Sequence, residues 1–175
     1  MSNIKRILRY SFYPSILGDV LIADDTIHLC WLSFADDKDA SLQELQNKYR
    51  SSELIQESSE LQKIVLDCIS SKWENLLNIP IHLHGTQFQQ DVWAELQKIP
   101  LGQTKTYKQI AAVIGRPKAV RAVWSAIGAN PIAIIIPCHR VVSSNGSLGG
   151  YHWGIKKKKL LLNHENVSSY WNFKW

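Results

Sequence analysis

Cys138 and His139 are neighbours within the short segment Pro137-Cys138-His139-Arg140-Val141. The thiolate is the reactive form of cysteine, and an adjacent base or positive charge makes it accessible near neutral pH. A cysteine that simply packs in the core is the more common alternative for an isolated pair. The apolar run 132–136, bounded by Pro131 and Pro137, predicts a buried strand that ends at this cysteine. The pair is therefore a candidate nucleophile and base at the end of a strand.

Length and composition set the first limits. The chain has 175 residues, of which 45% are hydrophobic, as in a globular protein of one domain or two small ones. The longest apolar runs are about seven residues, against the roughly 18 that a membrane span needs, so we expect no membrane partner. Residues 1–6 lack the apolar core of a secretory signal. Three cysteines without a framework spacing fit a reducing compartment.

The charge is divided unevenly along the chain. Residues 1–85 carry 8 Lys and Arg against 12 Asp and Glu, whereas residues 86–175 carry 12 against 3. The basic half suggests a polyanionic partner for the C-terminal part. The alternative is a surface that is merely basic, and charge alone does not distinguish DNA from RNA.

The first half predicts a small α/β arrangement. Short alternating runs between residues 4 and 34, separated by Gly18-Asp19 and Asp24-Asp25, predict an antiparallel meander with tight turns. Apolar residues at helical spacing follow at 40–49 and again from Leu61 to Leu77.

Two of the cysteines lie in this half. Cys30 falls in an apolar strand and Cys68 on an apolar helical stripe, so we expect both in the core. A zinc set could be imagined, but its spacing lacks the paired close ligands of a recognisable site, and we expect no metal. The residues of that imagined set are His28, Cys30, His82 and His84.

The second half predicts several helices. Thr86 is a good N-cap for a helix through about Lys98. Residues 107–114 and 118–127 predict two short helices, the first capped by Thr106 or Thr104.

The junction between the two short helices contains residues typical of a helix end and a helix start. Gly115 can end the first helix and Pro117 can stand in the first turn of the second. The result is a helix-turn-helix pattern, with an ordinary helical hairpin as the alternative. Lys118 and Arg121 fall near the start of the second helix, where a recognition helix meets nucleic acid.

The last part of the chain has three notable segments. Asn145-Gly146 predicts a tight turn and with it a hairpin or wing. Gly149-Gly150 allows the backbone to pass close to another group. A final helix is expected over 155–165, with Lys156–Lys159 in its first turns. Each of these lysines either lies on a solvated basic face or contacts a phosphate.

Several short motifs together resemble one family, the 6-O-alkylguanine-DNA alkyltransferases, also called methylated-DNA–protein-cysteine methyltransferases. The segment around Cys138 resembles their active-site signature, and the strong resemblance covers about residues 85 to 165. The further matching segments, in the family's order, are Phe88–Trp93, Thr106-Tyr107, Arg121–Val123, Asn130-Pro131, Gly149–Tyr151 and Leu161–Glu165.

The resemblance implies a fold. It would consist of an N-terminal RNase H-like α/β domain with an antiparallel sheet, residues 1–84. A mostly helical C-terminal domain, residues 85–175, would carry a winged helix-turn-helix and the active-site cysteine.

The resemblance also implies a reaction and its catalytic residues. Cys138 would take the alkyl group from 6-O-methylguanine, and from 4-O-methylthymine, once and irreversibly, without a cofactor. His139 would contact the thiol through a water, and Glu165 would hold His139. Asn130 corresponds to a hinge between the recognition helix and the active-site strand. The expected partner is double-stranded DNA that contains alkylated guanine, bound by a monomer in the cytoplasm or, in a eukaryote, in the nucleus.

The substrate contacts follow from the same resemblance. Tyr107 would line the pocket, the carbonyls of Cys138 and Val141 would accept the exocyclic amine, and the N–H near His152 would face the alkylated oxygen. Arg121 would enter the duplex in place of the extruded base. The substrate set is Tyr107, Val141, His152, Arg121 and Lys158, and the DNA-binding set is Arg121, Lys118 and Thr106.

Three residues depart from the family pattern. Trp124 stands in the recognition helix where many relatives have a small residue, and it would either pack inward or stack on DNA. Trp153 stands at a pocket-rim position and is expected to narrow the pocket against benzyl adducts. His152 replaces a smaller polar residue found in some relatives.

Two other functions compete with alkyl transfer. A non-catalytic regulator that binds the lesion would carry another residue in place of Cys138. A cysteine hydrolase would leave the helix-turn-helix and Arg121 unexplained.

Overall fold

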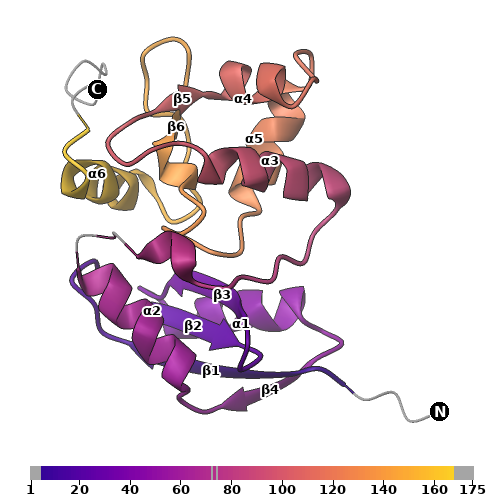
Figure 1. The fold of residues 1–175 in the computed structure, drawn as a ribbon, viewed down its shortest axis with the longest axis vertical. Helices are drawn as coiled ribbons and strands as arrows, with labels where there is room; N and C mark the ends of the chain where they lie inside the picture. The colour runs from indigo at the N-terminus through magenta and orange to yellow at the C-terminus, as the bar shows by residue number, and fades with distance from the viewer. Residues whose placement is uncertain (1–4, 72, 74, 168–175) are drawn as a thin grey trace. The chain divides into compact units, whose positions relative to one another are not determined.

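The computed structural model describes residues 5–71, 73 and 75–167. Residues 1–4, on which the expectation about a secretory signal partly rests, lie outside the described range. No helix within that range has an apolar stretch long enough to cross a membrane. The chain forms two compact units (Figure 1). The first contains the described residues up to His84 together with Pro131–Ala133, and the second contains Gly85–Asn130 and the described residues from Ile134 onward.

The first unit is built on a four-stranded sheet in the order β3-β2-β1-β4. Strands β1 (Ile7–Tyr13), β2 (Val20–Asp24) and β3 (Leu29–Phe34) pair in antiparallel fashion, which confirms the predicted meander. Strand β4 (Glu53–Gln56) was not predicted, and it pairs with β1 in parallel. It can do so because helix α1 (Lys38–Lys48) carries the chain from β3 back across the sheet.

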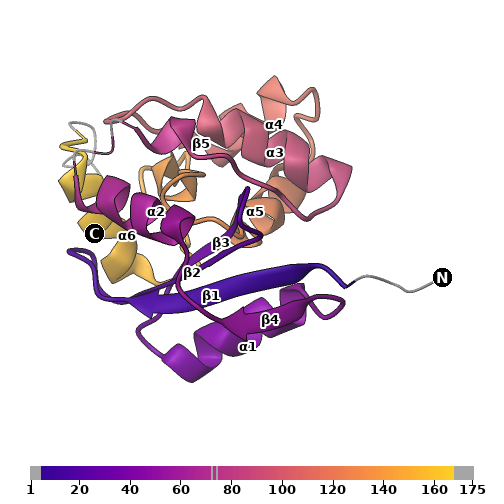
Figure 2. The same cartoon turned by 60° about the horizontal axis from the view of Figure 1, so that its bottom comes forward.

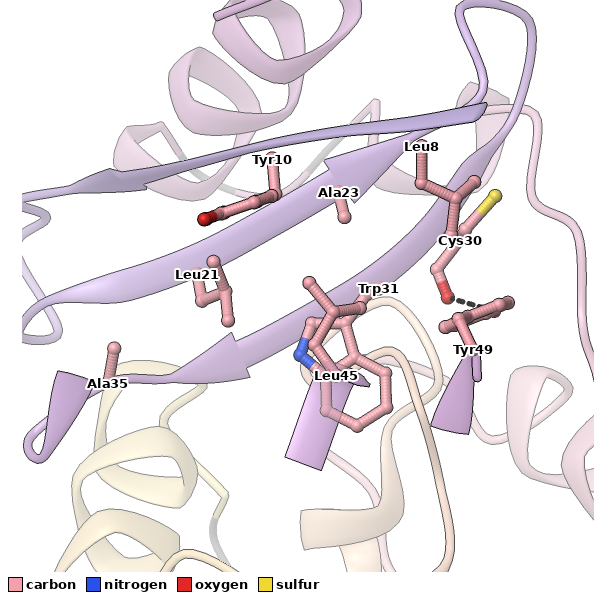
Figure 3. Close-up of a cluster of buried hydrophobic side chains, with 9 residues drawn as sticks. All are labelled: Leu8, Tyr10, Leu21, Ala23, Cys30, Trp31, Ala35, Leu45 and Tyr49. Atoms are coloured by element: carbon pink, nitrogen blue, oxygen red, sulfur yellow. Dashed lines mark hydrogen bonds between the residues drawn. The ribbon is translucent and has the colours of Figure 1, made fainter. Parts of the chain in front are cut away.

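Helices cover both faces of this sheet (Figure 2). On one face, Leu45 of α1 packs into a cluster with Leu21, Ala23 and other buried side chains, where the Tyr49 hydroxyl donates to the carbonyl of Cys30 (Figure 3). On the other face lies α2 (Glu60–Ser70), whose residue Gln62 donates to the Asp24 carboxylate at 2.7 Å. This two-sided cover explains why every residue of β2 is buried.

The second predicted helix of this unit is shorter than expected. Helix α2 ends at Ser70, and Ser71 has an extended backbone. Trp73 then takes a left-handed conformation with φ of 63°, which a helix cannot contain. A single 3-10 turn, η1 (Leu76–Asn78), follows, and the prediction of a helix to Leu77 is wrong. Cys30 is fully buried as expected, whereas Cys68 is only half-buried.

The second unit begins with the predicted helices. Helix α3 (Gln87–Gln97) starts at Thr86, and α4 (Tyr107–Val113) starts at Thr106. Each start is a capping box. The threonine hydroxyl accepts a hydrogen bond from the backbone N–H of the glutamine three residues later, and the side-chain oxygen of that glutamine accepts one from the backbone N–H of the threonine. The indole of Trp93 on α3 donates to Ala126 O of α5 at 2.8 Å, and this bond fixes the helix-turn-helix against α3.

The turn between the two short helices is longer than predicted. Gly115 has φ of 72°, as its place after α4 requires. Helix α5 (Val120–Gly128) begins two residues later than expected, so Pro117 and Lys118 lie in the turn before it. Ala119 precedes the helix without a side-chain cap, and a capping side chain is the signal that would have marked the start.

The segment that leads to Cys138 is not a strand. Its residues are buried, as predicted, but Ile134 has φ of 69°, in the left-handed region that β-branched residues avoid. Only Ile132 makes a bridge, to Leu32. The chain then forms a 3-10 turn, η2 (Cys138–Arg140), and a short strand, β6 (Val141–Val142). β6 pairs in parallel with β5 (Lys105–Thr106), and α6 (Ile155–His164) closes the unit.

Gly85 provides a test of the packing around α3. A Cβ atom at this position would lie 2.6 Å from two ring carbons of Trp93, which is fully buried. We therefore expect Gly85→Ala to lower the free energy of unfolding by about 1–3 kcal/mol. Urea unfolding followed by circular dichroism measures the change.

Gly128→Ala is the matched control, because nothing lies within 4 Å of the added carbon. Equal stability of Gly85→Ala and Gly128→Ala would contradict this packing.

Candidate active site

Cys138 lies at the inner end of a cavity in the second unit. Cys138 is 3% exposed to solvent, and the cavity has a volume of about 400 Å³. The walls come from α4, α5 and the segment after Gly149, so the helix-turn-helix forms one side of the site. The lining residues on which the following argument depends are Tyr107, Trp124, Cys138, Gly150, Tyr151 and His152.

Asn130 connects the end of α5 to the cysteine. Its side-chain amide donates to Ile136 O at 2.9 Å and to the Cys138 sulfur at 3.1 Å. The side chain is buried, so both bonds are made away from water. Because an amide nitrogen has two hydrogens, one group can hold the backbone of the turn and orient the sulfur together.

Opposing effects act on the Cys138 thiol. Burial raises its pKa, while the Asn130 hydrogen bond, the Lys158 charge and the Tyr151 hydroxyl lower it, and the net pKa is raised. The resting group is therefore the thiol near neutral pH, with three neighbours ready to stabilise the thiolate. Tyr151 was not predicted at the sulfur, although the Gly149–Tyr151 motif contained it.

A buried carboxylate holds the turn that carries the cysteine. Glu165 Oε1 lies 2.6 Å from His139 Nε2. Arg140 donates to both oxygens of Glu165, from Nε at 3.0 and 2.9 Å and from Nη2 at 2.9 Å. Its Nη1 donates to Ile99 O, and the Gly102 N–H donates to Glu165 at 3.2 Å. Every oxygen of the buried carboxylate is thus satisfied.

These contacts set the protonation of His139. Burial lowers the pKa of its imidazole and outweighs the Glu165 carboxylate, which acts in the opposite direction. Burial alone would raise the pKa of Glu165, but His139 and Arg140 lower it to about 2. A carboxylate only accepts hydrogen bonds, so neutral His139 carries its proton on Nε2. Its Nδ1 then has the lone pair of a base.

Lys158 differs from the prediction made for it. Within the lysine run we expected a solvated side chain or a phosphate contact, but Lys158 is fully buried. Its ammonium donates to Val141 O and Leu148 O at 2.6 Å and to Gly150 O at 3.2 Å. Burial lowers its pKa to about 8. A sequence run shows which residues are charged, but not that one of them points inward.

The glycine pair allows a close approach to Tyr107, as its sequence predicted. A Cβ at Gly149 would lie 2.8 Å from the Tyr107 hydroxyl, and Gly149 also has φ of 71°. The Tyr107 hydroxyl donates to Gly150 O at 3.4 Å, and burial raises its pKa to about 12. Tyr107 therefore enters the cavity as a neutral hydroxyl.

Comparison with known proteins identifies the family. Residues 87–167 match the family described as 6-O-methylguanine DNA methyltransferase, DNA binding domain. The inducible methylated-DNA–protein-cysteine methyltransferase of Bacillus subtilis is 41% identical over 79% of this chain and 80% of its own length. The chain belongs to this family.

Longer and solved members extend the comparison. The Escherichia coli bifunctional transcriptional activator/DNA repair enzyme Ada is 41% identical over 90% of this chain, which spans only 45% of Ada's length. The Mycobacterium tuberculosis O6-methylguanine methyltransferase is 33% identical, with a TM-score of 0.74 over 91% of this chain and 93% of that one. Its complex with DNA matches with a TM-score of 0.68 at 31% identity, over 93% and 94% of the two chains. These matches confirm the predicted α/β fold of the methyltransferase family.

The remaining predicted residues lie in different places around the cavity. Arg121 in the first turn of α5 and Lys118 in the turn before it are both exposed, outside the cavity lining. The Thr106 hydroxyl serves as the N-cap of α4. His152 lines the cavity, whereas Trp153 is not among the lining residues in the described part of the chain. The Trp153 ring packs against His152 and Tyr151, with centroids 4.9 and 5.3 Å apart, so its effect on the pocket stays a prediction.

The residues of the imagined zinc set are neighbours in the first unit, but they are not arranged as a metal site. The rings of His28 and His82 are 6.1 Å apart, and the His84 ring packs on Tyr49. Within the described ranges, no three His, Cys, Asp or Glu side chains are grouped to hold a metal ion.

The Glu165 cluster predicts an acid-sensitive component of stability. The folded pKa of about 2 lies below the ordinary 4.5, so this stabilisation is present above pH 4.5 and is lost as the pH falls toward 2. We expect Glu165→Gln to remove that pH dependence and to cost about 3–5 kcal/mol near pH 7, because Arg140 stays buried without its partner. Denaturant unfolding at a series of pH values measures both effects.

Glu60→Gln is the control, since Glu60 forms an exposed ion pair with Lys63. If Glu165→Gln kept the acid sensitivity of the wild type, the buried cluster would not be its source.

Proposed function

We propose that the protein repairs DNA by direct reversal, moving the alkyl group of 6-O-methylguanine, and of 4-O-methylthymine, onto Cys138. One observation carries the proposal: the cysteine of the family signature lies at the inner end of a cavity bounded by the helix-turn-helix. Family membership supports the reaction, and the basic second half supports DNA as the partner. All the residues of the candidate site lie within one unit of one chain, which supports action on DNA as a monomer.

The chemical step is a displacement at the alkyl carbon. A bond forms between the Cys138 sulfur and that carbon while the bond from the carbon to the guanine oxygen breaks. The electron pair of the broken bond stays with the guanine. The thiol proton passes through a water to Nδ1 of His139, which Glu165 orients through Nε2. The thioether product has no route back to the thiol, so each molecule reacts once.

The substrate must reach the sulfur from outside the duplex stack. A base inside duplex DNA is inaccessible at its modified atom, so the damaged nucleotide is extruded into the cavity at a cost of a few kcal/mol. Arg121, exposed on α5, fills the vacated space with its planar guanidinium. Lys118, in the turn before α5, contacts a phosphate.

Backbone groups then position the guanine. The carbonyls of Cys138 and Val141 accept its exocyclic amine. Val141 O already accepts a bond from Lys158, but a carbonyl has two lone pairs. The N–H of His152 faces the alkylated oxygen, and the Tyr107 hydroxyl gives up its long bond to Gly150 O and donates to the leaving guanine. Lys158 acts indirectly, because its ammonium holds this backbone and its charge favours the thiolate.

Label transfer tests the reaction. When the protein is mixed with DNA that carries a labelled methyl group on guanine, we expect no more than one equivalent of label on the protein. Cys138→Ser should accept none. Cys68→Ser changes a cysteine of the first unit that is distant in sequence from Cys138, and it should accept label as the wild type does. Mass spectrometry of the peptide that contains residue 138 locates the group.

A protein that binds the lesion and leaves Cys138 bare would instead be a non-catalytic regulator. Continued turnover beyond one equivalent would indicate a hydrolase.

Salt dependence tests the phosphate contacts. Binding to undamaged duplex should weaken by more than tenfold between ~50 and ~200 mM salt, because each phosphate contact releases counterions. Lys118→Ala should reduce the slope of log affinity against log salt by about one. Lys63→Ala, on an exposed ion pair of the first unit, should leave the slope unchanged. A flat response of the wild type would contradict a basic binding face.

A further inference from the structure

Trp124 is the least expected side chain on the recognition helix. Its neighbours Val123, Ala126 and Ile127 are buried and fix α5 in the unit, but Trp124 is 54% exposed. A single exposed apolar residue usually needs no explanation. This one does, because it also lines the cavity that contains Cys138.

The indole lies against a rigid part of the opposite wall. A Cβ at Gly150 would come within 3.5 Å of the Trp124 Nε1 and 3.8 Å of its Cζ2. The carbonyl of Gly150 accepts bonds from Tyr107 and Lys158, both of which are buried. The indole thus faces a backbone segment that is held from the interior and has little freedom to retreat.

Exposure gives the order of residues along the cavity. Cys138 is 3% exposed and Trp124 is 54% exposed, so the sulfur lies at the inner end and the indole at the mouth. The volume of about 400 Å³ is near the lower limit of the ~300–1,000 Å³ that small-molecule pockets span. In such a small cavity, the size of one side chain at the mouth decides what can enter.

We propose that Trp124 is a specificity-determining residue that limits the alkyl group to small substituents. The proposal rests on the alkyl-transfer function proposed above. A methyl group adds little to the width of guanine, so the cavity beside the indole can hold it without moving Trp124. A benzyl group must displace the indole, which the buried face of α5 and the Gly150 backbone oppose.

The test compares two alkyl groups on two variants. Rates of modification of Cys138 are measured with methylguanine and benzylguanine, each as the free base and in duplex DNA. We expect Trp124→Ala to raise the ratio of the benzyl rate to the methyl rate by about tenfold or more, since hydrophobic pockets discriminate small size differences by about 10–200-fold. Trp124→Phe, which keeps an aromatic ring of smaller size, should give an intermediate ratio.

Val113→Ala is the control, because it removes an exposed apolar side chain of the same unit that does not line the cavity. An unchanged ratio in both Trp124 variants would overturn the proposal. The proposal would also be overturned if the variants lost the same factor in rate with methylated and benzylated DNA while the ratio of benzyl to methyl rates for the free bases stayed unchanged. That result would make Trp124 a DNA contact. Absence of any Cys138 modification in the wild type would instead refute the alkyl-transfer function itself.

Discussion

The candidate active site depends on a single buried carboxylate. Glu165 stands at the end of α6, and its oxygens accept bonds from Arg140, His139 and the Gly102 N–H. Three segments that are distant in the sequence are thereby held around one negative charge. A buried carboxylate is stable only when its partners compensate the lost hydration, so the cluster forms as a unit. The turn that carries Cys138 is held in place by this cluster, through His139 and Arg140.

The fold was most predictable where the signals were local. Tight turns between alternating runs predicted β1 to β3, and Thr86 and Thr106 marked the starts of α3 and α4. Local patterns contain nothing about distant pairing, so the parallel match of β4 with β1 was missed. Residues 132–136 were correctly predicted as buried, but one left-handed residue, Ile134, prevents the strand that their composition favours.

The candidate site was likewise predictable where a local motif marked the residue, and not where long-range packing decided its position. The motifs around Cys138 and Glu165 were sufficient to nominate the residues. The structure places Glu165 against His139, as expected, and also places the Asn130 amide on the sulfur, which was not expected. The burial of Lys158 could not be predicted, because its three neighbours in the lysine run look identical to it in sequence. The positions of Trp124 and Trp153 relative to the cavity could not be predicted either, since both are tryptophans near expected contact residues.

The left-handed Ile134 has a consequence for engineering. Because that residue turns the chain away from a strand, the five-residue signature obtains its shape from the backbone before it and from the Asn130 amide. Grafting those five residues onto the end of a regular strand in another scaffold would transfer the sulfur without its surroundings. A portable module would extend at least from Asn130 to Glu165. It would also need a host backbone that supplies the Ile99 carbonyl, the Gly102 N–H and the Leu32 pairing with Pro131 and Ala133.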